Sequence, residues 1–267
     1  MYAFQYRKAA SLKEASELLK KDADAKPMSG GMTLIPTLKQ RLAQPTQLID
    51  ITGIAELSGI ESKNGVLTIG AATRHQQVAS SKVVRDVLPA LADLASNIAD
   101  PQVRNRGTIG GSVANNDPAA DYPAAVLGLD AKVITNQREI AAADFFQGMF
   151  STALEPGEIV VRIAFPLPKK AAYAKFPHPA SGYAMAGVFI AETASGVRVA
   201  VTGAGEGVFR WSDAEAALGK KMDAASLDKL TLATDGLNED IHGTREYRAQ
   251  LVKVMAGRAV AALAGKK

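Results

Sequence analysis

Cysteine is absent from this chain of 267 residues. Without a thiol, the chain forms no disulfide, offers no cysteine nucleophile and supplies no thiolate ligand to zinc or to an iron–sulfur cluster. The absence fits a reducing compartment, and we expect a cytoplasmic protein. Apolar residues make up 47% of the chain, which is enough for a hydrophobic core without covalent staples.

Aromatic residues are also scarce, at 6%, and the formal net charge is only +4. The basic pairs at 169–170, 220–221 and 266–267 are scattered along the chain and form no stripe. Nucleic-acid binding requires a clustered basic patch with interleaved aromatic residues. We therefore expect no nucleic-acid partner.

Long hydrophobic runs are missing as well. No apolar stretch approaches the roughly 20 residues that span a bilayer. Residues 1–21 are mixed and charged, with no apolar segment ahead of a small-residue cleavage site. We expect a soluble chain with no membrane span.

The first fifty residues alternate between strand and helix patterns, which predicts a small parallel sheet. Ser11 followed by Glu14 is a capping-box pattern and opens the first helix. The expected elements are strands at 4–6, 26–29 and 47–51, a helix of about ten residues from Leu12, and a helix over 33–41.

After Gly53 the pattern changes. Asn64-Gly65 between two apolar runs predicts a tight hairpin, and residues 104–116 are rich in glycine and asparagine. The other expected elements are helical segments at 83–98, with Pro89 near a helix start, and at 142–146, and strands at 132–135 and 158–165.

A linker rich in proline and lysine at 166–170 separates a second domain. Beyond it we expect antiparallel strands at 183–192 and 197–202 and helices within 213–263. The predicted domains are 1–168, with lobes of about 1–55 and 56–168, and 169–267.

Two double-glycine motifs carry the clearest chemical signal: Ser29-Gly30-Gly31-Met32-Thr33 and Thr108-Ile109-Gly110-Gly111-Ser112. Adjacent glycines leave no Cβ to block a close approach, so we expect backbone N–H groups of both motifs to converge on phosphate. Together they could hold the two phosphates of one dinucleotide from opposite sides; the alternative is two ordinary tight turns. Neither motif is a P-loop or the G-x-G-x-x-G of a nicotinamide-binding fold.

Other candidate residues give weaker signals. The three histidines show no metal-binding spacing, so we expect no metal site. His75 is expected on a helix surface, with covalent attachment of a flavin as the alternative. Asp117 and Asp121 form either an acid–base pair on one helix face or a cap at Asp117 ahead of Pro118.

The two glycine motifs in this order resemble those of the FAD-binding subunits of molybdenum hydroxylases. Residues 29–36 resemble the first flavin motif of that family and residues 104–115 the second. Residues 116–125 and 240–248 are similar to the medium subunit of aerobic carbon monoxide dehydrogenase-like enzymes. The resemblance covers nearly the whole chain and implies an α+β fold. A two-lobed FAD-binding domain of the vanillyl-alcohol oxidase (PCMH) type would be followed by a C-terminal domain of an antiparallel sheet plus helices.

The resemblance implies that FAD is the cofactor and that its pyrophosphate lies between the glycine motifs. It also implies a cofactor contact for the Asp121 carboxylate and an aromatic cover over the flavin ring. For Ile98 and Val160, plain core packing is the alternative. The implied cofactor-binding residues are Ser29, Gly30, Gly31, Met32, Thr33, Leu34, Ile98, Thr108, Ile109, Gly110, Gly111, Ser112, Asp121, Val160, Lys175 and Tyr183.

The implied activity is that of an oxidoreductase subunit that transfers electrons through FAD to an external acceptor such as NAD, a quinone or oxygen, with no catalytic acid or base of its own. Because this chain has no cysteine, the iron–sulfur clusters and the molybdenum centre must lie on partners. These are a small [2Fe-2S] subunit and a large molybdopterin-binding subunit, in a heterotrimer. Two alternatives stay open: a stand-alone flavin oxidoreductase acting on a small substrate, and a nucleotide-binding or scaffold protein without a redox role.

Overall fold

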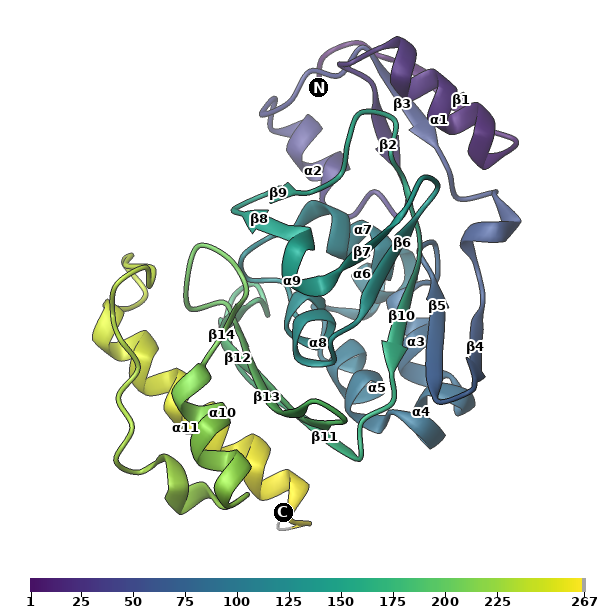
Figure 1. Cartoon of the computed structure of the whole chain (residues 1–267). Coiled ribbons are helices and arrows are strands. Elements are labelled where there is room, and N and C mark those ends of the chain that lie inside the picture. The colour runs from purple at the N-terminus through teal and green to yellow at the C-terminus, as the bar shows by residue number, and fades with distance from the viewer. Residues whose placement is uncertain (266–267) are drawn as a thin grey trace.

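The first fifty residues form the predicted parallel sheet, at the top of Figure 1. The computed structural model describes residues 1–265. Its first sheet has the strand order β1 (Gln5–Lys8), β3 (Gln47–Asp50), β2 (Lys26–Met28), and both pairings are parallel. The connecting helices are α1 (Leu12–Lys21) and α2 (Leu34–Lys39). The predicted start of α1 is confirmed, because the Ser11 hydroxyl accepts a hydrogen bond of 3.1 Å from the Glu14 amide.

A second, antiparallel sheet lies below the first. Its strand order is β4 (Ile60–Lys63), β5 (Val66–Gly70), β10 (Val160–Pro166), β6 (Lys132–Thr135), β7 (Glu139–Ala141). The predicted hairpin between β4 and β5 is confirmed, with φ angles of 52° at Asn64 and 75° at Gly65.

Short helices pack on the face of this sheet that carries Leu67, Ile69, Ile163 and Phe165, and several of them were not predicted. Pro89 begins a new helix, so the expected helical segment at 83–98 is two helices. Residues 101–115 are mostly helical, because the side chains of Asp100 and Thr108 each cap a helix. The elements are the 3-10 helix η1 (Ala55–Leu57), α3 (His75–Ser80), α4 (Lys82–Val87), α5 (Pro89–Ser96), α6 (Pro101–Arg106), α7 (Ile109–Asn115), α8 (Tyr122–Gly128), α9 (Ala142–Phe145), β8 (Phe146–Gly148) and β9 (Ser151–Thr152).

The C-terminal part is a four-stranded antiparallel sheet with helices on one face. Its order is β11 (Lys170–Pro177), β12 (Ala184–Thr193), β13 (Gly196–Thr202), β14 (Phe209–Arg210). The helices are α10 (Ser212–Lys220), the 3-10 helix η2 (Ala224–Leu227) and α11 (Arg245–Leu263). β11 was not predicted, and it shortens the proline-rich connection to residues 167–169.

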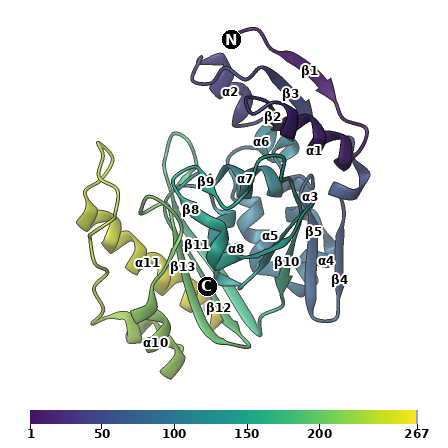
Figure 2. The same cartoon turned by 45° about the horizontal axis from the view of Figure 1, so that its top comes forward.

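The C-terminal sheet packs on both of its faces (Figure 2). Side chains alternate along β12, so that Phe189 and Ala191 join the core around α8, whereas Val188 and Ile190 join the core beneath α10 and α11. No helix within residues 1–265 is long and apolar enough to cross a membrane.

Strand β10 belongs to two cores at once. Ile159, just before the strand, and Val161 complete the core of the N-terminal lobe, beside residues of α1 and β3. Val160 and Ile163 point instead into the core around α8, which we call the central core. A break in the pairing register between Val160 and Arg162 accompanies this change of face. The N-terminal lobe is therefore completed by residues far along the chain.

Candidate cofactor-binding site

The two glycine motifs meet in space. The hydroxyl oxygens of Ser29 and Thr108, 79 positions apart, lie 3.0 Å from each other. Gly30 packs against the second motif so closely that a Cβ there would overlap the carbonyl group of Arg106 and come within 2.7 Å of the Gly107 Cα. Only glycine allows this approach of backbone to backbone.

The first motif offers free backbone donors. It forms the turn between β2 and α2, and Gly31 has a φ of +73°. Within residues 1–265, the amide N–H groups of residues 30–33 donate no hydrogen bond to another group. Successive unpaired N–H groups in such a turn form an anion-binding concavity. Thr33 is exposed beside them, and Met32 and Leu34 are half-buried.

The second motif differs from the expected phosphate loop. It is the first turn of α7, and its amides are already used: Ile109 donates to the Thr73 carbonyl at 3.1 Å and Gly110 to the Ala71 carbonyl at 2.9 Å. The amide of Gly111 donates to the Thr108 hydroxyl at 3.2 Å. Ile109 and Gly110 are buried. This motif therefore presents the exposed backbone of Gly111 and the Ser112 side chain, and its remaining backbone groups hold the helix in place.

A buried ion pair lies beside the glycine motifs. The ammonium nitrogen of Lys175, on β11, is 3.0 Å from an Asp121 carboxylate oxygen, and both side chains are about 5% exposed. The Tyr173 hydroxyl donates a hydrogen bond of 2.6 Å to the same carboxylate. Burial raises the pKa of Asp121, while the Lys175 charge and the Tyr173 hydroxyl oppose that rise.

The ammonium of Lys175 also holds the backbone beside two other predicted positions. It donates hydrogen bonds to the Asn97 carbonyl at 2.7 Å and to the Gly182 carbonyl at 3.0 Å. These carbonyls immediately precede Ile98 and Tyr183. Lys175 therefore fixes the backbone beside each residue expected to flank the flavin, and its donors point at protein groups. A cleft of about 460 Å³ opens here, lined by Ser96, Asn97, Ala99, Tyr173, Ala174, Lys175, Pro177 and Gly182.

Tyr183 stands at the mouth of the site, 42% exposed. Burial of its hydroxyl and the nearby Asp117 carboxylate raise the pKa of the phenol, and a hydrogen bond with the Thr33 side chain opposes the rise. The phenol is therefore protonated at neutral pH. This contact brings the residue just before β12 against Thr33 of the first glycine motif.

The two apolar positions differ in their surroundings. Ile98 is half-buried and packs against the central core, whereas the Val160 side chain lies inside that core. The neighbour of Val160 is tied to the second glycine motif, because the Val161 carbonyl accepts a hydrogen bond of 2.9 Å from Ala71, whose own carbonyl accepts from Gly110. Val160 can thus present only its backbone to a ligand.

His75 corrects an expectation. It begins α3 but is only 4% exposed, with its ring 5.4 Å from that of Tyr122. The expected surface position is wrong, because the side chain turns inward beneath Gly107. Burial, together with the nearby Arg104 charge, lowers the pKa of His75 to about 4.

The two aspartates expected on one helix face are apart, and two of the three histidines lie side by side. Asp117 and Asp121 share no helix face: a carboxylate oxygen of Asp117 accepts a hydrogen bond of 2.9 Å from the Ala119 amide in a turn, and Asp121 precedes α8. His178 and His242 meet edge to face, with 4.4 Å between ring centroids. No group of three or more potential ligands that could hold a metal ion occurs within residues 1–265.

Tyr173 is the site residue that sequence analysis missed. It lies two positions before Lys175 on β11, so the two side chains share one face of the strand. Recognition of β11 as a strand would have placed Tyr173 beside the predicted lysine. The strand was missed because it follows directly on the proline- and lysine-rich connection.

Comparisons with known proteins agree with this geometry. A family model described as the FAD binding domain in molybdopterin dehydrogenase matches residues 2–168. The chain is 34% identical to the glyceraldehyde dehydrogenase medium chain of Sulfolobus acidocaldarius over 96% of each chain. It is also 34% identical to the carbon monoxide dehydrogenase medium chain of Afipia carboxidovorans, over 97% of this chain and 96% of the other.

A solved structure gives the same result along the whole chain. The reconstituted CO dehydrogenase from Oligotropha carboxidovorans matches with a TM-score of 0.91 and 33% identity, covering 100% of this chain and 99% of that chain. The predicted fold class, a two-lobed FAD-binding domain followed by a C-terminal sheet domain, is confirmed.

The burial of His75 predicts a pH-dependent stability. The unfolded chain binds a proton near pH 6.5 and the folded protein only near pH 4. The stabilisation that comes from keeping His75 neutral is therefore fully present above pH 6.5. The free energy of unfolding falls by up to about 3 kcal/mol as the pH drops toward 4. Urea unfolding of wild type, His75→Gln and the control His242→Gln, at intervals between about pH 7 and pH 4, measures this. A slope in His75→Gln as steep as in wild type would contradict the assignment.

The Lys175–Asp121 pair predicts a strongly coupled mutant cycle. Lys175→Met leaves a buried carboxylate without its cation and should cost about 3–5 kcal/mol of unfolding free energy. Lys175→Met/Asp121→Asn should cost less than the sum of the single changes, because no charge is left unpaired. Lys132→Met is the control, since the Lys132–Glu139 pair is exposed and should contribute about 1 kcal/mol or less. Additive costs in urea unfolding would refute the buried pair.

Proposed function

Because the chain belongs to the family of FAD-binding subunits of molybdopterin dehydrogenases, we propose that it transfers electrons within a molybdenum hydroxylase. The electrons come from [2Fe-2S] clusters on a partner subunit and pass through FAD to an external acceptor. Family membership confirms the resemblance predicted from the sequence, an oxidoreductase assignment and FAD as the cofactor.

The observation that carries the proposal is the contact between the two glycine motifs. The unpaired amides of residues 30–33 form a donor set suited to a diphosphate. The hydroxyls of Ser29 and Thr108 meet at the same place. Tyr183 contacts the Thr33 side chain, and its neighbour Gly182 lines the cleft together with Lys175. The site therefore has an anion-binding end at the first glycine motif and a cleft flanked by an aromatic residue, as a flavin dinucleotide requires.

The contacts of each residue indicate its role in binding the cofactor. The first motif binds the diphosphate, and the second motif positions it through Thr108 and the exposed backbone of Gly111. Lys175 and Asp121 hold the segments that carry Ile98 and Tyr183. A protonated Tyr183 covers the ring. No residue here acts as a catalytic acid or base, since bound FAD itself supplies stepwise electron transfer.

The partner subunits are inferred from the metal-ligating side chain that this chain lacks. With no cysteine in its sequence, it cannot ligate an iron–sulfur cluster through thiolates. We infer a small [2Fe-2S] subunit and a large molybdopterin-binding subunit as partners in a cytoplasmic complex. We also propose that residues 1–168 form the FAD-binding domain, with lobes of about 1–55 and 56–168, and that residues 169–267 form a second domain.

The proposed function is tested by the cofactor and metals that accompany a tagged chain from its native host. We expect a flavin absorption spectrum, together with molybdenum, iron and acid-labile sulfide in the purified complex. Acid precipitation should release FAD into the supernatant, because the side chain of His75, the candidate for covalent attachment of the flavin, is buried. Purification as a lone chain whose flavin is reduced by a small organic donor would instead support a stand-alone oxidoreductase.

We expect the variant Gly30→Ala to fold but to bind the cofactor more weakly. The new methyl group would collide with the Arg106 carbonyl and push the two motifs apart, so we expect FAD to bind at least about tenfold more weakly. Gly219→Ala is the control, because that helical glycine has open space around it and should keep wild-type affinity. Fluorescence titration with FAD compares the three proteins, and unchanged affinity in Gly30→Ala would contradict the site.

A further inference from the structure

A second joint connects the N-terminal lobe to the rest of the protein, away from the glycine motifs. It lies where α1 meets the loop before β10. The buried Ser16 hydroxyl on α1 donates a hydrogen bond of 2.7 Å to the Gly157 carbonyl. The side-chain amide of Asn136 donates to the Ser16 hydroxyl oxygen at 3.0 Å and to the same carbonyl at 3.3 Å. We call Ser16, Asn136 and Gly157 the interlobe latch.

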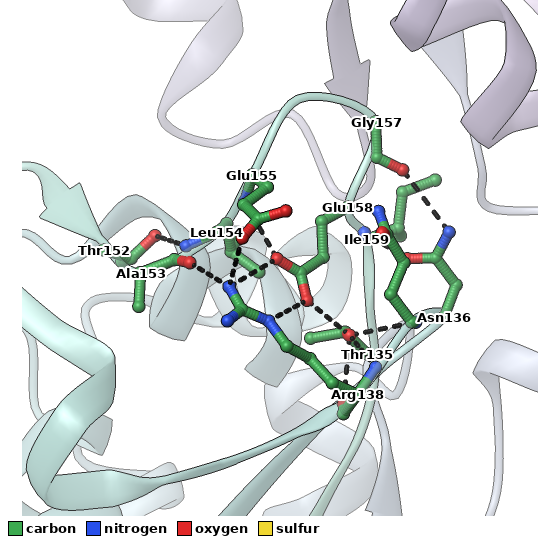
Figure 3. Close-up of polar contacts among 11 residues, drawn as sticks. Thr135, Asn136, Arg138, Thr152, Ala153, Leu154, Glu155, Gly157, Glu158 and Ile159 are labelled. Carbon is green, nitrogen blue, oxygen red and sulfur yellow. Dashed lines mark hydrogen bonds and ion pairs between the residues drawn. The ribbon is translucent and has the colours of Figure 1, made fainter.

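The latch depends on a buried carboxylate behind it (Figure 3). The Glu158 side chain is fully buried and accepts hydrogen bonds from the Arg138 guanidinium at 3.0 and 3.1 Å. It also accepts from the Thr135 hydroxyl at 2.7 Å and from the Glu155 amide at 2.8 Å. Both carboxylate oxygens are thus held, and they fix the turn at 155–158 against the hairpin of β6 and β7.

Gly157 fits this turn for two reasons. Its φ is +76°, which strains any residue with a Cβ. A Cβ there would also collide with the Lys20 side chain on α1 and lie 3.0 Å from the Ser16 carbonyl oxygen. The turn therefore presses its backbone directly against α1, much as Gly30 presses against the second glycine motif.

The two joints are linked through the backbone. Ile159 follows the latch, donates its amide hydrogen to the Asn136 side chain at 2.8 Å and enters the core of the N-terminal lobe. Two residues later, the Val161 carbonyl accepts from Ala71, whose carbonyl accepts from Gly110. A short series of hydrogen bonds thereby connects the latch to the second glycine motif.

We propose that Glu158, held by Arg138, is a positioning residue: through the interlobe latch it sets the orientation of the N-terminal lobe and with it the spacing of the two glycine motifs around the diphosphate of FAD. The inference rests on the proposed function for its ligand. It assigns a role in cofactor binding to residues outside the two glycine motifs.

The test measures lobe spacing directly. Because the chain has no cysteine, Lys13→Cys on α1 and Lys82→Cys on α4 give two unique sites for spin labels, one in each lobe. Pulsed electron paramagnetic resonance then records the distance distribution in the full chain without FAD. We expect Glu158→Gln and the milder Ser16→Ala to broaden or shift the distribution. Glu139→Gln, the same change in an exposed pair on the same hairpin, should leave it unchanged.

FAD titration of the same proteins gives the functional readout. We expect Glu158→Gln to raise the FAD dissociation constant about tenfold and Ser16→Ala to raise it less, with Glu139→Gln like wild type. Distance distributions and affinities for Glu158→Gln and Ser16→Ala that match those of Glu139→Gln would overturn the inference. If wild type itself bound no FAD, the proposed function would fail, and the distance distributions alone would decide whether the latch sets the lobe orientation.

Discussion

Backbone contact at Gly30 is the constraint on which the rest of the site depends. Strand β2 runs into the first glycine motif, and α7 begins at the second. The two motifs can contribute to one binding site only because they are in contact. Strand β10 supports that contact from behind, since Ile159 and Val161 complete the core of the N-terminal lobe. A lobe that buries so few residues of its own relies on this shared strand for its stability.

The two motifs contribute differently although their sequences look alike. The first keeps its amides unpaired, as an anion site requires, while the second uses its amides to tie α7 to Thr73 and Ala71. Rigid support on one side and open donors on the other give a preorganised site, because little backbone must reorder when a ligand binds. The Lys175–Asp121 pair does the same for the cleft, because it fixes the segments before Ile98 and Tyr183.

Features governed by local chemistry could be predicted from the sequence. The helix start at Ser11, the Asn64-Gly65 hairpin and the glycine motifs each need only neighbouring residues, and the two motifs carried the family resemblance. Features governed by burial could not. The side chain of His75 turns into the core although a helix-surface position was expected, and β11 follows directly on a proline-rich connection, so Tyr173 was missed. The helix at 109–115 was not predicted, because its two adjacent glycines disfavour a helix and conceal the Thr108 cap.

The glycine motifs are proposed to anchor a diphosphate. Calorimetric titration of the apoprotein with FAD and with riboflavin, which carries the same ring without phosphate, measures how much the motifs contribute to binding. We expect riboflavin to bind at least about a hundredfold more weakly than FAD, equivalent to about 2.7 kcal/mol. Equal affinity for the two ligands would show that the ring alone is recognised and that the motifs anchor no diphosphate.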